Sequence, residues 1–204
     1  MDINHFVHIY RAGESNETLL LFHGTGADER DLIPLAAKTG WKGNILSLRG
    51  RVLENGMPRF FKRLSFGVFD IEDLKARTHE LLEYIPLAAQ HYGFDVKKTS
   101  SLGYSNGANL IGAALLIQPG YFQKSVLLRP MIPFEPEATK TKAEGQILLL
   151  SGANDPTVPT GMPERWRAIL LDIYPNAVQL RLMPGGHGLS QADLDLITDF
   201  WKVP

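Results

Sequence analysis

The sequence alternates between short apolar runs and longer amphipathic segments, and this alternation is the feature that most limits the folds open to the chain. Apolar runs predict strands over residues 18–22, 44–48, 99–104, 125–129, 146–152 and 178–184. Segments with helical periodicity predict helices over residues 29–39, 71–92, 106–117, 163–174 and 191–201. Several of the strands are apolar without alternation, which is typical of strands covered on both faces. The pattern predicts an open α/β fold with a mostly parallel central sheet and helices on both faces.

The chain is long enough to build one hydrophobic core. With 204 residues, 44% of them hydrophobic, we expect a single domain over residues 1–204. Residues 4–13 alternate well enough to predict an antiparallel edge strand that precedes the parallel part of the sheet. Residues 135–144 are polar and are expected to form a surface connection.

Charge and composition argue against several classes of partner. The 21 Lys and Arg residues nearly balance the 22 Asp and Glu residues, and no basic stripe is present, so we expect no nucleic-acid partner. The absence of cysteine fits a reducing compartment and excludes disulfides and thiolate chemistry. No run approaches the ~20 apolar residues of a membrane span, and the N-terminus does not resemble a secretion signal. We therefore expect a cytoplasmic protein without a membrane span.

Ser105 lies between Gly103 and Gly107 in the stretch GYSNG, where a predicted strand meets a predicted helix. This context is typical of a nucleophile elbow, in which the serine occupies a tight turn and the two glycines relieve steric crowding. The same turn would direct the backbone N–H of Asn106 at a reacting carbonyl, at the positive end of the helix. A plain turn would also use small residues, so Ser105 needs partners elsewhere in the chain to be a nucleophile.

A serine hydroxyl becomes a good nucleophile only when a base accepts its proton, and His187 is the only histidine after Ser105. It follows the last predicted strand, in the glycine-rich stretch PGGHGLS. A carboxylate must then orient the imidazole, and Asp155 lies a few residues beyond the strand 146–152. Asp155 also precedes a proline, so it is suited to a turn, and the two roles are compatible.

The stretch LLFHGTGADERDL predicts a second donor for an oxyanion. The backbone N–H of Thr25 is the candidate, since Gly24 and Gly26 allow a sharp loop, and His23 is interpreted as structural. The same glycines could begin a dinucleotide-binding fingerprint. Glu29 stands where the third glycine of that fingerprint belongs, however, and the chain has no Gly-Lys-Ser/Thr phosphate loop. We therefore expect neither a bound nucleotide nor another cofactor.

Two further features have no clear role in this chemistry. No metal site is expected, because metal-ligand spacing is absent among the other histidines, His5, His8, His79 and His91. The segment 51–70 is dense in aromatic and basic residues. It is either an excursion packed under the helix 71–92 or a wall of the substrate pocket, with Phe60, Phe61 and Phe66 as the candidate lining residues.

The stretches LLLFHGTGADERDL, GYSNGANL, SGANDPTVP and PGGHGLS, in this order, resemble the phospholipase/carboxylesterase family of small α/β hydrolases, which includes the acyl-protein thioesterases. The resemblance covers nearly the whole chain and implies an α/β-hydrolase fold without a large cap domain. It implies hydrolysis of small carboxylic esters through an acyl-enzyme, without a cofactor. The residues implied are a triad and two oxyanion donors, namely Ser105, Asp155 and His187 with Thr25 and Asn106.

Asn106 is a departure from the typical thioesterase of this family, which has glutamine after the nucleophile. The sequence GYSNGAN more closely resembles that of bacterial carboxylesterases, including a branch linked to hydroquinone resistance. Acyl-thioesterase and lysophospholipase activities stay open as alternatives on the same site. A non-catalytic ligand-binding protein on a hydrolase scaffold is an alternative of another class, and a homodimer is compatible with the family resemblance.

Overall fold

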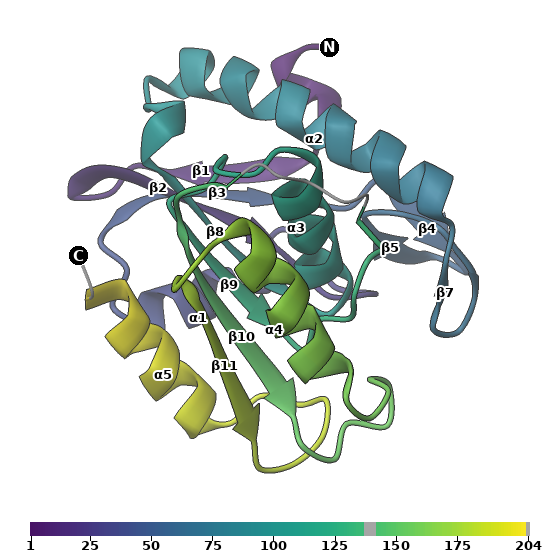
Figure 1. Ribbon diagram of the computed structural model, residues 1–204. Helices are drawn as coiled ribbons and strands as arrows, with labels where there is room; N and C mark the ends of the chain where they lie inside the picture. The colour runs from purple at the N-terminus through teal and green to yellow at the C-terminus, as the bar shows by residue number, and fades with distance from the viewer. Residues whose placement is uncertain (137–141, 203–204) are drawn as a thin grey trace.

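The chain folds around a seven-stranded sheet, shown in Figure 1 as a computed structural model that describes residues 1–136 and 142–202. Its strands lie in the order β1-β3-β2-β8-β9-β10-β11. Their bounds are β1 (His8–Arg11), β2 (Ser15–Phe22), β3 (Gly43–Leu48), β8 (Thr99–Tyr104), β9 (Lys124–Leu128), β10 (Gln146–Gly152) and β11 (Val178–Met183). Strand β1 is antiparallel to β3, and every other neighbouring pair is parallel. The predicted mostly parallel sheet with an antiparallel N-terminal edge strand is confirmed.

Helices cover both faces of this sheet, as the sequence predicts. They are α1 (Ile33–Lys38), α2 (Ile71–Tyr92), α3 (Asn106–Ile117), α4 (Met162–Ile173) and α5 (Gln191–Lys202), and short 3₁₀ turns occur at η1 (Ile3–His5) and η2 (Val96–Lys98). Helices α2, α3 and α4 pack into one core cluster on one face of the sheet, and α1 and α5 pack into the cluster on the other face (Figure 1). The architecture is that of an α/β hydrolase without a large cap.

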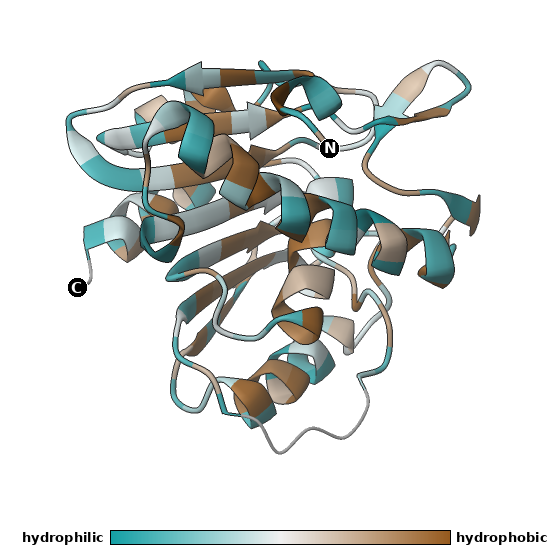
Figure 2. Ribbon diagram, turned by 90° about the horizontal axis from the view of Figure 1, so that it is seen from above, coloured by the Kyte–Doolittle hydropathy of each residue, from teal (hydrophilic) through white to brown (hydrophobic). Residues whose placement is uncertain are grey.

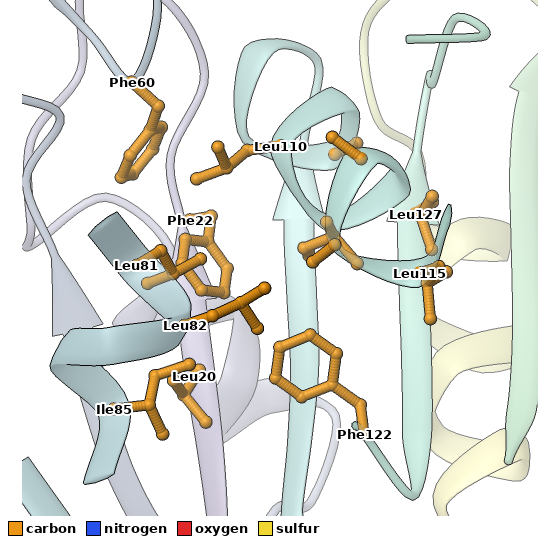
Figure 3. Packing of buried hydrophobic residues seen from close by; sticks show 14 of the residues in the cluster. Leu20, Phe22, Phe60, Leu81, Leu82, Ile85, Leu110, Leu115, Phe122 and Leu127 are labelled. Atoms are coloured by element: carbon orange, nitrogen blue, oxygen red, sulfur yellow. The ribbon is translucent and has the colours of Figure 1, made fainter. Parts of the chain in front are cut away.

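The central strands bury side chains on both faces, which explains why their sequences lack alternation. Along β2, Leu20 and Phe22 pack into the cluster beneath α2 and α3, whereas Leu19 and Leu21 pack into the cluster beneath α1 and α5. Figure 3 shows Phe22 and Leu20 meeting the leucines of α2. Hydrophobic residues, brown in Figure 2, are concentrated in the central strands and alternate with hydrophilic ones along the helices.

Several predicted boundaries differ from the structure, and two of these differences have a clear local cause. The helix expected from residue 29 begins at Ile33, because residues 28–32 form turns in which the Asp28 carboxylate accepts hydrogen bonds from the backbone and side chain of Arg30. The strand expected to reach Arg129 ends at Leu128, because Arg129 adopts a positive φ of 54°. A non-glycine residue in this region is uncommon and interrupts an extended strand.

The segment 51–70 forms two small hairpins that the apolar pattern did not predict. They pair β4 (Val52–Glu54) with β5 (Met57–Arg59), and β6 (Arg63–Ser65) with β7 (Val68–Phe69). The first hairpin turns at Asn55 and Gly56, which both have a positive φ. The connection expected over residues 135–144 is exposed at both ends, and its residues 137–141 lie outside the described part of the chain.

Candidate active site

Ser105 occupies a strained turn between β8 and α3, with a φ of 51° and a ψ of −109°. A Cβ atom on Gly107 would lie 2.1 Å from the carbonyl oxygen of Phe22, and one on Gly103 would lie 2.7 Å from the carbonyl carbon of Gly107. The backbone N–H of Ser105 donates to the carbonyl of Leu128 at 2.8 Å. The two glycines are therefore required by the close packing of the helix start against β2 and β8, and the neighbouring strand fixes the serine.

His187 and Asp155 come from loops that follow β11 and β10, and they form a chain of hydrogen bonds with Ser105. His187 Nε2 lies 3.0 Å from Ser105 Oγ, and His187 Nδ1 lies 2.7 Å from Asp155 Oδ2. The Asp155 side chain is fully buried, whereas that of His187 is 31% exposed. The three side chains that the sequence singled out thus meet at the carboxyl ends of the parallel strands, where open α/β sheets bind their ligands.

Thr157 is a partner of Asp155 that sequence reasoning missed. Its backbone N–H and its hydroxyl both donate to Asp155 Oδ1, at 2.9 and 2.7 Å, and its Oγ1 lies 3.0 Å from His187 Nδ1. Burial would by itself raise the pKa of Asp155, but the hydrogen bonds from Thr157 and His187 outweigh burial and lower this pKa. Asp155 is therefore held as a carboxylate. The available signal was the spacing of Thr157, two residues beyond an aspartate in a turn.

A buried ion pair holds the loop that carries His187. Arg129 and Asp193 are 1% and 0% exposed, and the guanidinium binds both carboxylate oxygens, at 2.8 and 3.1 Å. The same guanidinium donates to the carbonyls of Gly186 and Gly188, at 3.1 and 2.7 Å. These two residues flank His187, so Arg129 fixes the loop on both sides of the imidazole. No local sequence signal reveals a pair separated by 64 residues.

Thr25 and Asn106, whose backbone amides are the candidate oxyanion donors, both line the cavity in front of Ser105. Within the described residues, neither amide donates a hydrogen bond to another group of the protein. His23 fixes the Thr25 loop, because its Nε2 accepts from the backbone of Gly50 at 3.0 Å and its Nδ1 is 2.6 Å from the carbonyl of Gly24. Burial lowers the pKa of His23, which favours the neutral ring, and the hydrogen bond that Nε2 accepts leaves the proton on Nδ1, facing the Gly24 carbonyl.

Asn106 also has a role that the sequence did not reveal. Its side-chain Oδ1 accepts a hydrogen bond from the backbone N–H of Phe60 at 2.8 Å. The residue after Ser105 therefore anchors the segment 51–70 to the start of α3.

A cavity of about 370 Å³ opens in front of Ser105. Phe66 and Phe69 line it, whereas Phe60 and Phe61 do not, since they are 2% and 0% exposed and belong to the core. The segment 51–70 thus combines both interpretations, a packed excursion and a pocket wall, and of the three candidate lining residues only Phe66 lines the cavity. Ser105, His187 and several of the residues described above also line the cavity. Four lining residues not yet described are Arg59, Arg63, Asn109 and Met131.

His5, His8 and Glu29 have partners outside this site. His5 contacts Glu80, and His8 Nε2 lies 2.6 Å from the hydroxyl of Tyr92. Glu29, at the position that decided against a dinucleotide fingerprint, is paired with Arg49 at 2.9 Å. In residues 1–136 and 142–202, no group of three His, Asp or Glu side chains is placed to hold a metal ion. None of the helices in these ranges is long and apolar enough to cross a bilayer.

The chain is similar to known hydrolases over almost its whole length. It is 37% identical over 195 residues to the Bacillus subtilis protein named "Putative hydrolase MhqD", covering 96% of this chain and 97% of that protein. A carboxylesterase from Bacillus cereus is 36% identical, with a TM-score of 0.92 and coverage of 97% and 93%. A carboxylesterase from Mesorhizobium loti is 30% identical, with a TM-score of 0.87 and coverage of 98% and 95%. No protein-family model matches the chain.

Proposed function

The chain belongs to the phospholipase/carboxylesterase family of α/β hydrolases, and we propose that it hydrolyses small carboxylic esters with Ser105 as the nucleophile. The observation that carries this proposal is the unbroken hydrogen-bonded chain from Ser105 Oγ through His187 to the buried Asp155. Such a chain has the parts of a nucleophile, a general base and an orienting carboxylate in reach of one another.

In the proposed reaction, His187 Nε2 accepts the hydroxyl proton while Ser105 Oγ attacks the ester carbonyl. Asp155 keeps the proton of the neutral ring on Nδ1 and stabilises the imidazolium that forms. The imidazolium then protonates the leaving alkoxide, and an alcohol departs from the acyl-enzyme. A water molecule, deprotonated by the same ring, attacks the acyl carbon and releases the acid, which regenerates Ser105.

The backbone amides of Thr25 and Asn106 are the proposed donors to the oxyanion. Their support is that Thr25 and Asn106 both line the cavity beside Ser105 and that, among the described residues, neither amide has a protein acceptor that would compete. Asn106 N–H also lies at the N-terminus of the 12-residue helix α3, whose partial positive charge favours a developing negative charge.

The size of the cavity favours small substrates. A volume of about 370 Å³ lies at the lower end of the range for small-molecule pockets, which is about 300–1,000 Å³. Phe66, Phe69 and Met131 give it an apolar side. We therefore expect short-chain or aromatic esters to be better substrates than long-chain acyl groups.

The test compares wild type and Ser105→Ala on p-nitrophenyl esters from acetate to octanoate. Wild type should release nitrophenolate, with kcat/KM highest for the short esters, and Ser105→Ala should lower kcat at least about 10⁴-fold. Ser15→Ala is the matched control, because Ser15 is exposed at the N-terminal end of β2, whereas Ser105 lies at the carboxyl ends of the strands. Intact-mass spectrometry should find the acyl adduct on wild type and not on Ser105→Ala.

Equal turnover in wild type and Ser105→Ala would refute the assignment of the nucleophile. Faster turnover of acyl thioesters or lysophospholipids than of every ester, at matched concentration, would move the proposal to those substrates. Tight binding of an ester without turnover by a folded wild type would support a non-catalytic receptor instead.

A further inference from the structure

The active-site cavity has an excess of positive charge at the end formed by the segment 51–70. Arg59 and Arg63 both line the cavity, and Glu54 lies between them. Glu54 Oε1 accepts from Arg63 Nε at 2.8 Å, whereas Glu54 Oε2 is 3.4 Å from Arg59 Nη1 and makes no hydrogen bond. Two guanidinium groups therefore share one carboxylate, which leaves about one positive charge uncompensated.

Arg59 is the more deeply buried of the two, with a side chain that is 4% exposed. Its Nε donates to the carbonyl of Phe61 at 3.2 Å, and its Nη1 donates to Thr25 Oγ1 at 2.7 Å. Burial, followed by repulsion from Arg63, lowers the pKa of Arg59, and the attraction of Glu54 offsets only part of this. A buried charge that is only partly compensated is costly, and a hydrogen-bonded anion in the cavity would relieve that cost.

Donor groups for such an anion are available. Within residues 1–136 and 142–202, Nη2 of Arg59 and both terminal nitrogens of Arg63 donate no hydrogen bond to the protein. Phe66 lies over the Arg63 guanidinium, with its ring centroid 5.6 Å from Cζ, and this contact steadies the side chain on the cavity wall. The planar fork of arginine matches the two oxygens of a carboxylate.

Because Arg59 and Arg63 line the same small cavity as Ser105, we propose that the preferred substrates are esters that carry a second, free carboxylate, which these two arginines bind. The inference rests on the proposed esterase function and adds its substrate class. The hydrogen bond from Arg59 to Thr25 places the carboxylate subsite next to the loop of the proposed oxyanion donor. The apolar body of the substrate would contact Phe66, Phe69 and Met131.

Two pairs of esters test the proposal, each pair differing only in whether a carboxylate is free or methylated. The carboxylate lies on the alcohol side in 4-acetoxybenzoate and its methyl ester, and on the acyl side in mono-4-nitrophenyl adipate and its methyl ester. In at least one pair, wild type should prefer the free carboxylate by about tenfold in kcat/KM, equivalent to about 1.4 kcal/mol. Raising the ionic strength should reduce this preference.

Three substitutions decide whether the arginines cause the preference, and the ratio of kcat/KM within each pair is the readout. Arg63→Gln should lower the ratio about tenfold. Glu54→Gln should raise it, because it frees both guanidinium groups from their shared carboxylate. Arg181→Gln removes the same charge from an exposed position on β11 and should leave the ratio unchanged. A merely structural role of the hairpins would not give opposite changes for Arg63→Gln and Glu54→Gln.

Binding to Ser105→Ala, measured by titration calorimetry with the same four esters, keeps this test separate from turnover. Tighter binding of a free carboxylate, lost with Arg63→Gln in that background, supports the subsite even if no ester is hydrolysed. Hydrolysis of the neutral esters without any carboxylate preference would overturn the inference and leave the esterase proposal intact. A preference that Arg63→Gln and Arg181→Gln change equally would also overturn it.

Discussion

Replacing Arg129 with methionine tests whether the buried ion pair, rather than the loop sequence alone, holds His187 in place. Methionine keeps much of the volume of the arginine side chain but removes every donor. The change leaves Asp193 buried without its cation, and it leaves the carbonyls of Gly186 and Gly188 without the guanidinium that now binds them. Both stability and turnover should therefore fall.

The size of the stability loss follows from the burial of the pair. Removing one member of a buried ion pair costs about 3–5 kcal/mol, because the other charge stays desolvated. The lost hydrogen bonds to the two glycine carbonyls overlap with this cost and do not simply add to it. We expect about 4 kcal/mol, which for a chain of 204 residues lowers Tm by about 8–16 °C.

Arg129→Lys separates the ion pair from the loop contacts. A lysine ammonium can still pair with Asp193, but it lacks the planar fork that reaches the carboxylate and both glycine carbonyls together. It should recover more than half of the lost unfolding free energy, while kcat stays reduced. A displacement of about 1 Å at the base is enough to cost about a hundredfold in rate. Urea denaturation followed by circular dichroism, and p-nitrophenyl acetate hydrolysis, give the two readouts.

The stability loss of Arg129→Met should also depend on pH, because Asp193 titrates differently in wild type and in this variant. In wild type, burial would raise the pKa of Asp193, but the hydrogen bonds from Arg129 and Ser190 lower it overall. A depressed pKa contributes stability above the unfolded value of about 3.9, and this contribution disappears as pH falls through the folded pKa. Without Arg129, burial is opposed only by the hydrogen bonds from Ser190, so the pKa of Asp193 should be higher than in wild type and the stability that its ionisation contributes should be lost.

The difference in unfolding free energy between wild type and Arg129→Met should therefore be smaller near pH 3 than at pH 7. The double variant Arg129→Met/Asp193→Asn lacks the buried carboxylate. The pH dependence of the unfolding free energy that Arg129→Met introduces should therefore disappear in it. The reasoning fails if Arg129→Met unfolds within about 1 kcal/mol of wild type at pH 7. It also fails if Arg129→Lys restores full turnover.

Substitutions at two further positions test the geometry around Ser105. Gly107→Ala brings a Cβ atom within 2.1 Å of the Phe22 carbonyl, so it should abolish activity and lower Tm, and a variant with wild-type Tm and turnover would contradict the packing argument. Thr157→Val removes the hydroxyl donor to Asp155 but keeps the backbone one, so the pKa of Asp155 should rise and kcat should fall about tenfold. Thr157→Ser, which keeps the hydroxyl, should stay near wild-type turnover, and equal losses in both Thr157 variants would refute the role of that hydrogen bond.

The meeting of Ser105, Asp155 and His187 was predictable because each follows a strand and the carboxyl ends of parallel strands share one edge of the sheet. The support around them was not predictable. Arg129 adopts a positive φ directly after β9 and binds Asp193 and the two glycine carbonyls, and nothing in the apolar pattern marks that conformation or those contacts. The hairpins of segment 51–70 did have one available signal, the Asn55-Gly56 dipeptide, which favours a two-residue turn.

The edge of the sheet that carries Ser105, Asp155 and His187 is held together by contacts between consecutive strand ends. The Leu128 carbonyl accepts from Ser105 N–H, and the Leu150 carbonyl accepts from Arg129 N–H at 2.7 Å. The loop that carries His187 crosses so close to β10 that a Cβ atom on Gly152 would lie 2.1 Å from the Gly186 carbonyl. These contacts all belong to the central sheet and its loops.

The residues proposed to select the substrate lie outside the central sheet. Arg59, Arg63 and Phe66 lie on small hairpins that form no part of the central sheet. The hydrogen bond from Phe60 N–H to the Asn106 side chain ties these hairpins to the start of α3, directly beside Ser105. Substitutions on the cavity side of the hairpins can therefore change which ester binds while the sheet keeps the hydrogen-bonded chain of Ser105 in place.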